Sequence, residues 1–208
     1  GVTPRVPDIP GIDHPKVLTY AEVVRDGKPV GRTVAVIGAG GIGVDVSEFL
    51  THEHSPTLDL KEWRQEWGVA DPESAPGALT TPQPSPSPRE VYLLQRKPGR
   101  IGAGLAKTTG WVHRAALKAK GVHELSGVNY ERIDDAGLHI SFGEKHERPR
   151  TLDVDTVVIC AGQESVRDLV DELTVAGVST HIIGGADVAA ELDAKRAINQ
   201  GTRLAAQI

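Results

Sequence analysis

Residues 34–43 constrain the fold more than any other part of this 208-residue chain. The four residues before Gly38 form an apolar run rich in β-branched side chains, which is typical of a buried parallel strand. Gly38, Gly40 and Gly43 follow at once in the spacing G-x-G-x-x-G. A strand, a glycine loop and a helix start in this order predict a dinucleotide-binding turn.

Each glycine of the loop has a separate task in such a turn. The first permits the tight turn, the second lets the backbone approach a pyrophosphate, and the third lets the helix pack closely on the strand. The alternative is a glycine-rich turn without a ligand. Because apolar residues continue at helical spacing from Val44 to Leu50, we favour the dinucleotide. The expected cofactor-binding loop comprises Gly38, Ala39, Gly40, Gly41, Ile42 and Gly43.

Composition excludes several classes of function. The net charge of −5 gives no general attraction to nucleic acid or to a membrane surface. Cys160 is the single cysteine, so an intrachain disulfide or redox dithiol is impossible, and we expect a buried core thiol. No apolar run approaches the roughly 18 residues of a membrane helix, and no secretory signal is visible, so we expect a cytoplasmic protein. The missing methionine and the opening glycine suggest a fragment.

The second predicted strand, residues 90–95, indicates which dinucleotide binds. An acid after this strand takes the ribose 2′-hydroxyl of NAD, whereas arginine accommodates the 2′-phosphate of NADP. Here Arg96 and Lys97 follow and no acid does. They open a stretch, residues 96–120, that holds seven Lys or Arg and no Asp or Glu, including Arg100. We therefore expect NADPH, with Arg96, Lys97 and Arg100 on its phosphates; ordinary exposed strand-end charges are the alternative.

The stretch 51–88 is a long insertion between the glycine-loop helix and the second strand. It explains why Arg96 lies farther from the glycines than the usual spacing of about 20 residues. Such a loop is commonly an insertion or a lid. We expect Trp63 and Trp67 to pack it down together with Leu60. Lys120, beyond the insertion, is expected on a solvated helix face.

The remaining pattern predicts the fold class. A helix over the second half of residues 102–120, a strand at 122–125, a hairpin at 128–142 and a strand from 152 to Cys160 follow in order. Residues 1–32 are rich in proline and predict a connector with a short helix at 20–25. The whole is α/β, a Rossmann-like parallel sheet with an antiparallel β excursion. We expect no metal site, because His52 and His54 lack further ligands.

Two segments resemble the pyridine-nucleotide-disulfide oxidoreductase superfamily. These are Cys160-Ala161-Gly162 and the stretch at 182–187 that ends in Gly185-Ala186-Asp187. The resemblance implies that Ala161 and Gly162 pass beside the cofactor, and that Gly185 and Asp187 contact FAD. It also implies that Asp45 lies near the nicotinamide, although a helix-surface aspartate is an equal alternative.

Three longer motifs, at 108–114, 158–164 and 191–198, are similar to bacterial-type NADPH-dependent 2,4-dienoyl-CoA reductases. Trimethylamine or histamine dehydrogenase-like proteins, and old-yellow-enzyme-type reductases, are the near alternatives. The resemblance implies hydride transfer from NADPH to FAD for reduction of an unsaturated fatty acyl-CoA. A nucleotide-binding module without catalysis is the alternative of another class.

In those relatives a barrel with FMN, an iron–sulfur cluster and an FAD domain with its own glycine motif precede this region. Since this chain has one cysteine and one such glycine motif, we expect an excised piece of the parent. Its parts would be a connector from the FAD domain (1–32), an NADPH-binding domain (33–180) and an FAD-domain segment (181–208). The FAD site would be incomplete, and no residue of the chain is expected to be catalytic.

Overall fold

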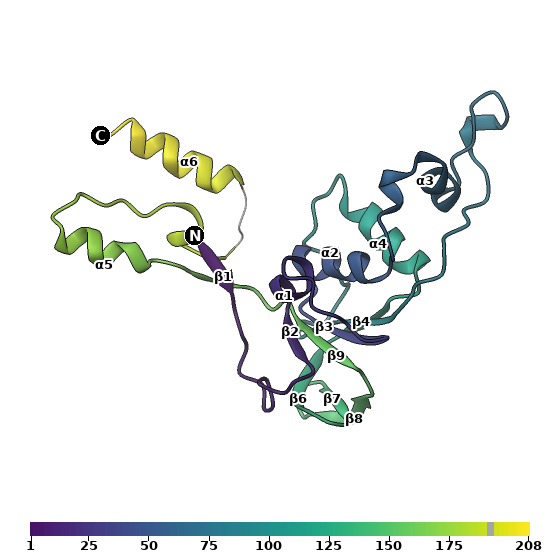
Figure 1. Ribbon diagram of the computed structural model, residues 1–208, viewed down its shortest axis with the longest axis horizontal. Coiled ribbons are helices and arrows are strands. Elements are labelled where there is room, and N and C mark those ends of the chain that lie inside the picture. The colour runs from purple at the N-terminus through teal and green to yellow at the C-terminus, as the bar shows by residue number, and fades with distance from the viewer. Residues whose placement is uncertain (191–193) are drawn as a thin grey trace. The chain divides into compact units, whose positions relative to one another are not determined.

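The computed structural model describes residues 1–190 and 194–208, which fall into two compact units (Figure 1). The sheet unit is Pro7–Cys160, and the terminal unit combines Gly1–Val6 with Ala161–Ile208. The two units correspond to a continuous segment and to the two chain ends that flank it.

A five-stranded parallel sheet is the centre of the sheet unit. Its strand order is β2-β9-β3-β4-β5, and all four neighbouring pairs are parallel. The strands are β2 (Val17–Thr19), β3 (Thr33–Ile37), β4 (Glu90–Gln95), β5 (His123–Ser126) and β9 (Thr156–Ile159). The prediction of an α/β fold with a Rossmann-like parallel sheet is confirmed.

The inner strands are apolar because both faces of the sheet are covered. In β3 the residues from Val34 to Ile37 are fully buried, and Ile37 lies in register with Leu94 of β4 and Ile159 of β9. This register brings the ends of three strands together at one edge of the sheet.

Helices cover one side of this sheet, and Figure 1 shows α2 (Gly41–Leu50) and α4 (Gly110–Ala119) lying over it. Val44 and Leu50 of α2 and Leu117 of α4 are fully buried in the core. The helix predicted over the second half of residues 102–120 is confirmed as α4, which ends at Ala119. The helices of the sheet unit are α1 (Tyr20–Val24), α2 (Gly41–Leu50), α3 (Leu60–Trp67) and α4 (Gly110–Ala119), with short 3₁₀ turns at Pro56–Leu58 and Pro76–Ala78.

A separate antiparallel sheet forms the predicted excursion. It has the order β6-β7-β8, with strands β6 (Val128–Asp134), β7 (Gly137–Phe142) and β8 (Glu147–Leu152). The predicted hairpin of β6 and β7 is confirmed. The third strand was not predicted, because its first five residues are exposed and it shows no alternation of apolar and polar side chains.

Two strand predictions are wrong. The strand expected from residue 152 to Cys160 is interrupted at residues 153–155, between β8 and β9. Asp155 Oδ2 accepts the backbone N–H groups of Arg32 (2.8 Å) and Thr33 (2.9 Å). Within the expected connector, β2 adds an edge strand to the parallel sheet. Its three residues are too few to show a periodic pattern. The short helix expected there is confirmed as α1, which a Thr19–Glu22 capping box begins.

Two packing predictions for the insertion are also wrong. Leu60 is 62% exposed and does not pack the insertion down, whereas Trp63 and Trp67 are half-buried. Lys120 is not solvated, because only 1% of its side chain is exposed and its Nζ lies 2.8 Å from Glu66 Oε1. A cation that looked like a surface charge thus holds the insertion to the end of α4.

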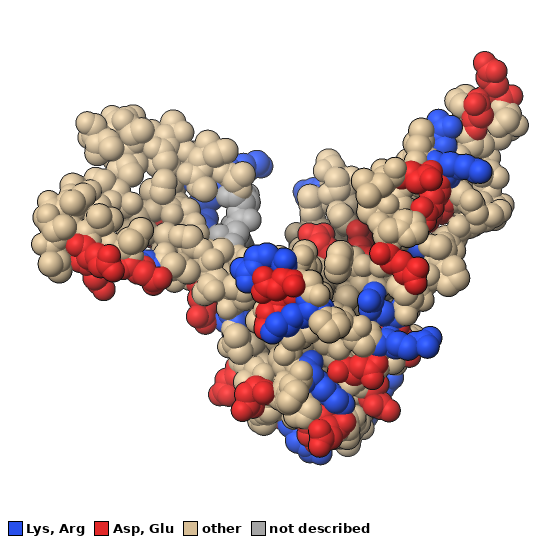
Figure 2. Space-filling view, in the orientation of Figure 1, with Lys and Arg blue, Asp and Glu red and all other residues tan. Residues whose placement is uncertain are grey.

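The terminal unit contains strands β1 (Val2–Pro4) and β10 (Gln163–Ser165), which pair antiparallel. Helices α5 (Asp168–Val175) and α6 (Ala194–Ala205) and a 3₁₀ turn at Gly184–Ala186 follow. Among the residues described in α5 and α6 none is buried, and Figure 2 shows acidic side chains gathered along α5. The first three residues of the motif at 191–198, Glu191, Leu192 and Asp193, lie outside the described residues.

Candidate nucleotide site

The predicted glycine loop lies at the carboxyl edge of the parallel sheet. Gly38 directly follows β3, and its N–H donates to Leu94 O of β4 at 2.9 Å. On the other side, Cys160 N–H donates to Ile37 O at 2.8 Å. Gly38 has a φ of +108°, which favours glycine. Ligands of open α/β sheets bind at this edge.

The N-terminus of α2 faces the loop. Gly40 is its N-cap, and no described side chain caps it. The first N–H groups of a helix have no partner within the helix, and they carry the positive end of the helix dipole. This end can therefore receive a phosphate.

The glycines differ in the space around them. A Cβ on Gly43 would lie 1.7 Å from Gly38 O, so only glycine lets α2 start so close to the turn. A Cβ on Gly40 or Gly41 would meet no atom within 4 Å. There is thus no room for a side chain at Gly43, whereas the space beside Gly40 and Gly41 is free, as a bound pyrophosphate requires. Ala39 and Ile42 pack against the core from within the same turn.

The predicted phosphate-binding cations follow β4, the neighbour of β3. The side-chain amide of Gln95 donates to Lys97 O (3.0 Å) and Gly99 O (3.2 Å), which fixes the course of this turn. Arg96, Lys97 and Arg100 are all exposed. The structure therefore places these cations on a braced turn beside the glycine loop, with their side chains accessible.

Asp45 and Cys160 have different surroundings. Asp45 is exposed on α2, one turn after Gly41. Cys160 is 6% exposed, and burial raises the pKa of its thiol to about 12. The prediction of a buried core thiol is confirmed.

The other four predicted cofactor residues belong to the terminal unit, where side chains connect their segments. Ser165 Oγ donates to Gly185 O at 2.8 Å, and Arg167 Nε donates to Ala186 O at 2.6 Å. Asp187 Oδ2 accepts the side-chain amide of Gln200 at 2.8 Å. This unit thus brings the segment after Gly162 and the segment 185–187 together.

Arg5 contacts two of the predicted cofactor residues, although the sequence did not indicate this. Its Nε and Nη2 donate to Ala161 O at 2.9 and 2.5 Å, and its backbone N–H donates to Gly162 O at 3.0 Å. Its partners lie about 156 positions along the chain, so no local pattern marks it. Arg5 fixes the backbone of two predicted cofactor residues.

The parallel sheet, its glycine loop and the antiparallel excursion define a flavoprotein-type FAD/NAD(P)-binding fold. Residues 1–195 match the model of the family described as pyridine nucleotide-disulphide oxidoreductase. The chain belongs to this family of oxidoreductases, whose members bind FAD and NAD(P).

Several solved structures share the fold. A 2-naphthoyl-CoA reductase is 20% identical with a TM-score of 0.70, and the match covers 100% of this chain and 26% of the reductase. A 6-hydroxypseudooxynicotine amine oxidase from Pseudomonas geniculata N1 is 18% identical with a TM-score of 0.70, and the match covers 98% of this chain and 27% of the oxidase. Histamine dehydrogenase from Rhizobium sp. 4-9 is 16% identical with a TM-score of 0.66, and the match covers 99% of this chain and 29% of the dehydrogenase. The chain thus spans less than a third of each of these proteins.

Within residues 1–190 and 194–208, none of the helices combines the length and the apolar character that a membrane span needs.

Proposed function

We propose that the chain is the NADPH-binding portion of a flavoprotein reductase, in which hydride passes from NADPH to FAD. The observation that carries the choice of NADPH is the turn after β4, where Arg96 and Lys97 stand exposed without an acid. Arginine at this point accommodates a 2′-phosphate, whereas an acid would repel it. In this proposal residues 33–180 hold NADPH and residues 181–208 belong to the FAD domain.

The roles of the sheet unit's residues follow from their positions. N–H groups of Gly40 to Gly43 receive the pyrophosphate at the start of α2. Arg96 and Lys97 bind the 2′-phosphate, and Arg100 adds positive charge on the same turn. Asp45 is assigned to the nicotinamide end of the cofactor.

Residues of the terminal unit are also assigned to the cofactors. Ala161 and Gly162 present backbone groups to the cofactor, with Arg5 holding their carbonyl oxygens. Gly185 and Asp187 are assigned to FAD, and Gln200 fixes the Asp187 carboxylate. One glycine motif cannot hold two dinucleotides, so the FAD site needs residues beyond those of this chain.

The proposed substrate of the complete protein is an unsaturated fatty acyl-CoA, as in 2,4-dienoyl-CoA reductases. Support comes from the motifs at 108–114 and 158–164 and from the similarity to a 2-naphthoyl-CoA reductase. In the complete protein, FMN and an iron–sulfur cluster would lie in other domains. The second candidate is an amine oxidoreductase, favoured by the similarity to the amine oxidase and to histamine dehydrogenase. Rates of NADPH oxidation with a dienoyl-CoA, compared with amine-dependent acceptor reduction, separate the two.

Titration of the purified chain with NADPH and NADH tests the nucleotide assignment. We expect NADPH to bind at least about tenfold more tightly, since charge-assisted hydrogen bonds contribute about 1.5–3 kcal/mol. The double variant R96Q/K97Q should bind NADPH about tenfold more weakly and leave NADH binding unchanged. Lys118→Gln, an exposed change on α4 in the same basic stretch, is the matched control. Equal affinity of the unaltered chain for the two nucleotides contradicts the roles of Arg96 and Lys97.

A further inference from the structure

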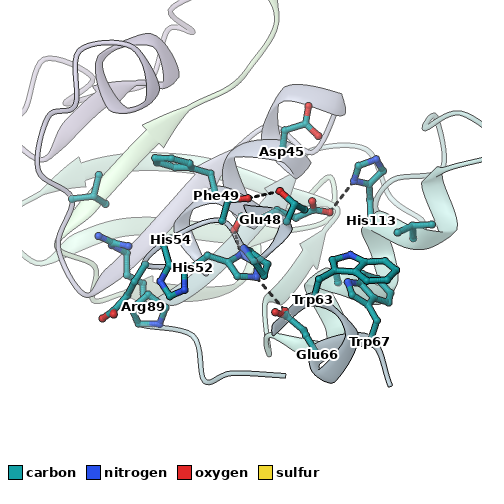
Figure 3. Close-up of a pocket in the computed structure, with 18 of the residues that line it drawn as sticks. Asp45, Glu48, Phe49, His52, His54, Trp63, Glu66, Trp67, Arg89 and His113 are labelled. Carbon is teal, nitrogen blue, oxygen red and sulfur yellow. Dashed lines mark hydrogen bonds and ion pairs between the residues drawn. The ribbon is translucent and has the colours of Figure 1, made fainter. Parts of the chain in front are cut away.

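Charged side chains beside the insertion bind one another. The insertion, α2 and α4 line a cavity of about 810 Å³ within the sheet unit (Figure 3). In its wall, Glu48 Oε1 lies 2.8 Å from His113 Nδ1. Glu66 Oε1 lies 3.2 Å from His52 Nε2 and 2.8 Å from Lys120 Nζ. The charges of these two acids are therefore used to hold the sheet unit together.

The cations that follow β4 are different, because no acid pairs with them. Within residues 1–190 and 194–208, none of Arg96, Lys97 and Arg100 has an ion-pair partner, and all three are exposed. Like charges this close in sequence repel one another. The turn that carries them, residues 96–99, therefore needs other contacts to keep one shape while no ligand is bound.

Gln95 supplies these contacts through the backbone of the turn. Its Nε2, which carries two N–H groups, donates to Lys97 O (3.0 Å) and Gly99 O (3.2 Å). Lys97 O also accepts the backbone N–H of Gly127 at 3.2 Å, from the turn between β5 and β6. Pro98 lies between the two bonded carbonyl groups, and its ring fixes its own φ. The backbone is thus held on both sides of the proline.

The support itself is rigid. Gln95 is the last residue of β4 and lies in register with Ser126 of β5, so it belongs to the parallel sheet and not to the turn. Sites that stand on strands are more precise than sites on loops. A carboxylate in place of the Gln95 amide would accept hydrogen bonds but donate none, so it could not bind the two carbonyl oxygens.

We propose that Gln95 is a positioning residue for nucleotide selection, whose amide holds the turn in the shape in which Arg96 and Lys97 receive the 2′-phosphate of NADPH. This inference rests on the proposed NADPH-binding function. A turn that is ordered before binding lowers the entropy cost of binding the phosphate. NADH lacks the 2′-phosphate and does not use these cations, so the support from Gln95 acts on NADPH alone.

Titration of Gln95→Met with both nucleotides tests this selectivity. Methionine has an unbranched side chain of similar length but donates no hydrogen bond. We expect the Kd for NADPH to rise about five- to tenfold and the Kd for NADH to stay within about twofold, because only NADPH depends on the two lost hydrogen bonds. A sheet unit that is merely destabilised would weaken both nucleotides alike. Gln207→Met, an exposed change in the terminal unit, is the matched control and should alter neither Kd.

Trypsin reports on the turn without any nucleotide. It cleaves after Arg96 and Arg100, whereas Pro98 protects the bond after Lys97. We expect cleavage after Arg96 and Arg100 to be at least about threefold faster in Gln95→Met, because proteolysis follows local opening. Gln95→Glu keeps the shape of glutamine but cannot donate, so it should be cleaved faster as well. Mass spectrometry of the fragments measures these rates, and unaltered rates in both variants overturn the proposal.

The two experiments separate this inference from the proposed function. Equal affinity of the unaltered chain for NADPH and NADH refutes the proposed function and the selective role of Gln95 together. If the unaltered chain prefers NADPH and Gln95→Met keeps the full preference, only the role of Gln95 is overturned. Loss of the preference together with faster cleavage is the result that we expect.

Discussion

Gly43 shows how a single residue sets both the packing and the proposed function of the loop. A Cβ there would lie 1.7 Å from Gly38 O. Because this oxygen belongs to the backbone, it cannot move aside as the end of a flexible side chain could. We expect Gly43→Ala to lower the free energy of unfolding by about 3 kcal/mol, the upper end of the usual cost of overpacking. NADPH binding should fall with it, because the start of α2 must move.

Gly41→Ala is the matched control for this prediction. A Cβ on Gly41 meets no atom within 4 Å, and alanine favours the helix by up to about 1 kcal/mol. Its free energy of unfolding should therefore be unchanged or slightly higher. Urea denaturation of both variants checks the pair, and equal stability of the two would contradict the close approach at Gly43.

Some residues of the sites were predictable and others were not, for a physical reason. The glycine loop follows from three glycines within six positions, so its signal is local. Lys120 binds Glu66 and Ser85 O, which are 54 and 35 positions away, and nothing in its own neighbourhood shows that it is buried. The spacing of Trp63, Glu66 and Trp67, three and four residues apart, is the signal that could have indicated the helix α3 within the insertion.

At the scale of elements, the insertion depends on one buried ion pair. Lys120 Nζ lies 2.8 Å from Glu66 Oε1 of α3 and donates to Ser85 O at 3.0 Å, so it binds the insertion at two points. We expect Lys120→Met to lower the free energy of unfolding by about 3–5 kcal/mol, because Glu66 would remain buried without its cation. Lys118→Met, two residues away and exposed, should change it by less than about 0.5 kcal/mol. Equal unfolding curves of the two variants would show that the Lys120–Glu66 ion pair does not contribute to the free energy of unfolding.

The same pair gives a pH dependence. Burial alone would raise the pKa of Glu66, but the hydrogen bonds from Lys120 and His52 outweigh it and hold the pKa below its ordinary value of 4.5. A carboxylate with a lowered pKa contributes stability above the unfolded pKa and loses it as pH falls. The difference between the unaltered chain and Lys120→Met should therefore shrink below about pH 4.5.

Among the elements, the strands that carry the proposed nucleotide site were the predictable ones. β3 and β4 are runs of apolar residues because they are buried on both faces. β8 and β2 were missed because one is mostly exposed and the other has three residues. Both lie away from the glycine loop, so the errors changed the outline of the fold but not the placement of the loop.

For the whole molecule, the core belongs to one unit. Every buried hydrophobic side chain in the described part of the chain lies in the sheet unit, from Ile9 to Cys160. The terminal unit instead exposes large apolar side chains such as Leu169, Val175 and Ile198, which are 66%, 90% and 66% exposed. Sequence patterns could not show this division, because α5 and α6 are amphipathic whether or not their apolar faces are covered.

We therefore expect residues 7–160 alone to fold. Their thermal unfolding, followed by circular dichroism, should be cooperative and have a midpoint within about 5 °C of that of the whole chain, since the entire core is retained. Residues 161–208 alone should show little helix, because short helices without packing are marginal in water. A stable helical signal from residues 161–208, or a non-cooperative transition of residues 7–160, would contradict this division.

The pairing of β1 with β10 has a consequence for the order of folding. It joins residues 159 to 163 positions apart, next to the contact from Arg5 to Ala161, which spans 156 positions. Closing so long a loop in a flexible chain costs about 4 kcal/mol, which a ribbon of three residue pairs cannot offset by itself. Once the sheet unit has folded, its two ends are tethered and most of that cost has been met. We therefore expect the β1–β10 ribbon to form only after residues 163–165 have been synthesised and the sheet unit has folded.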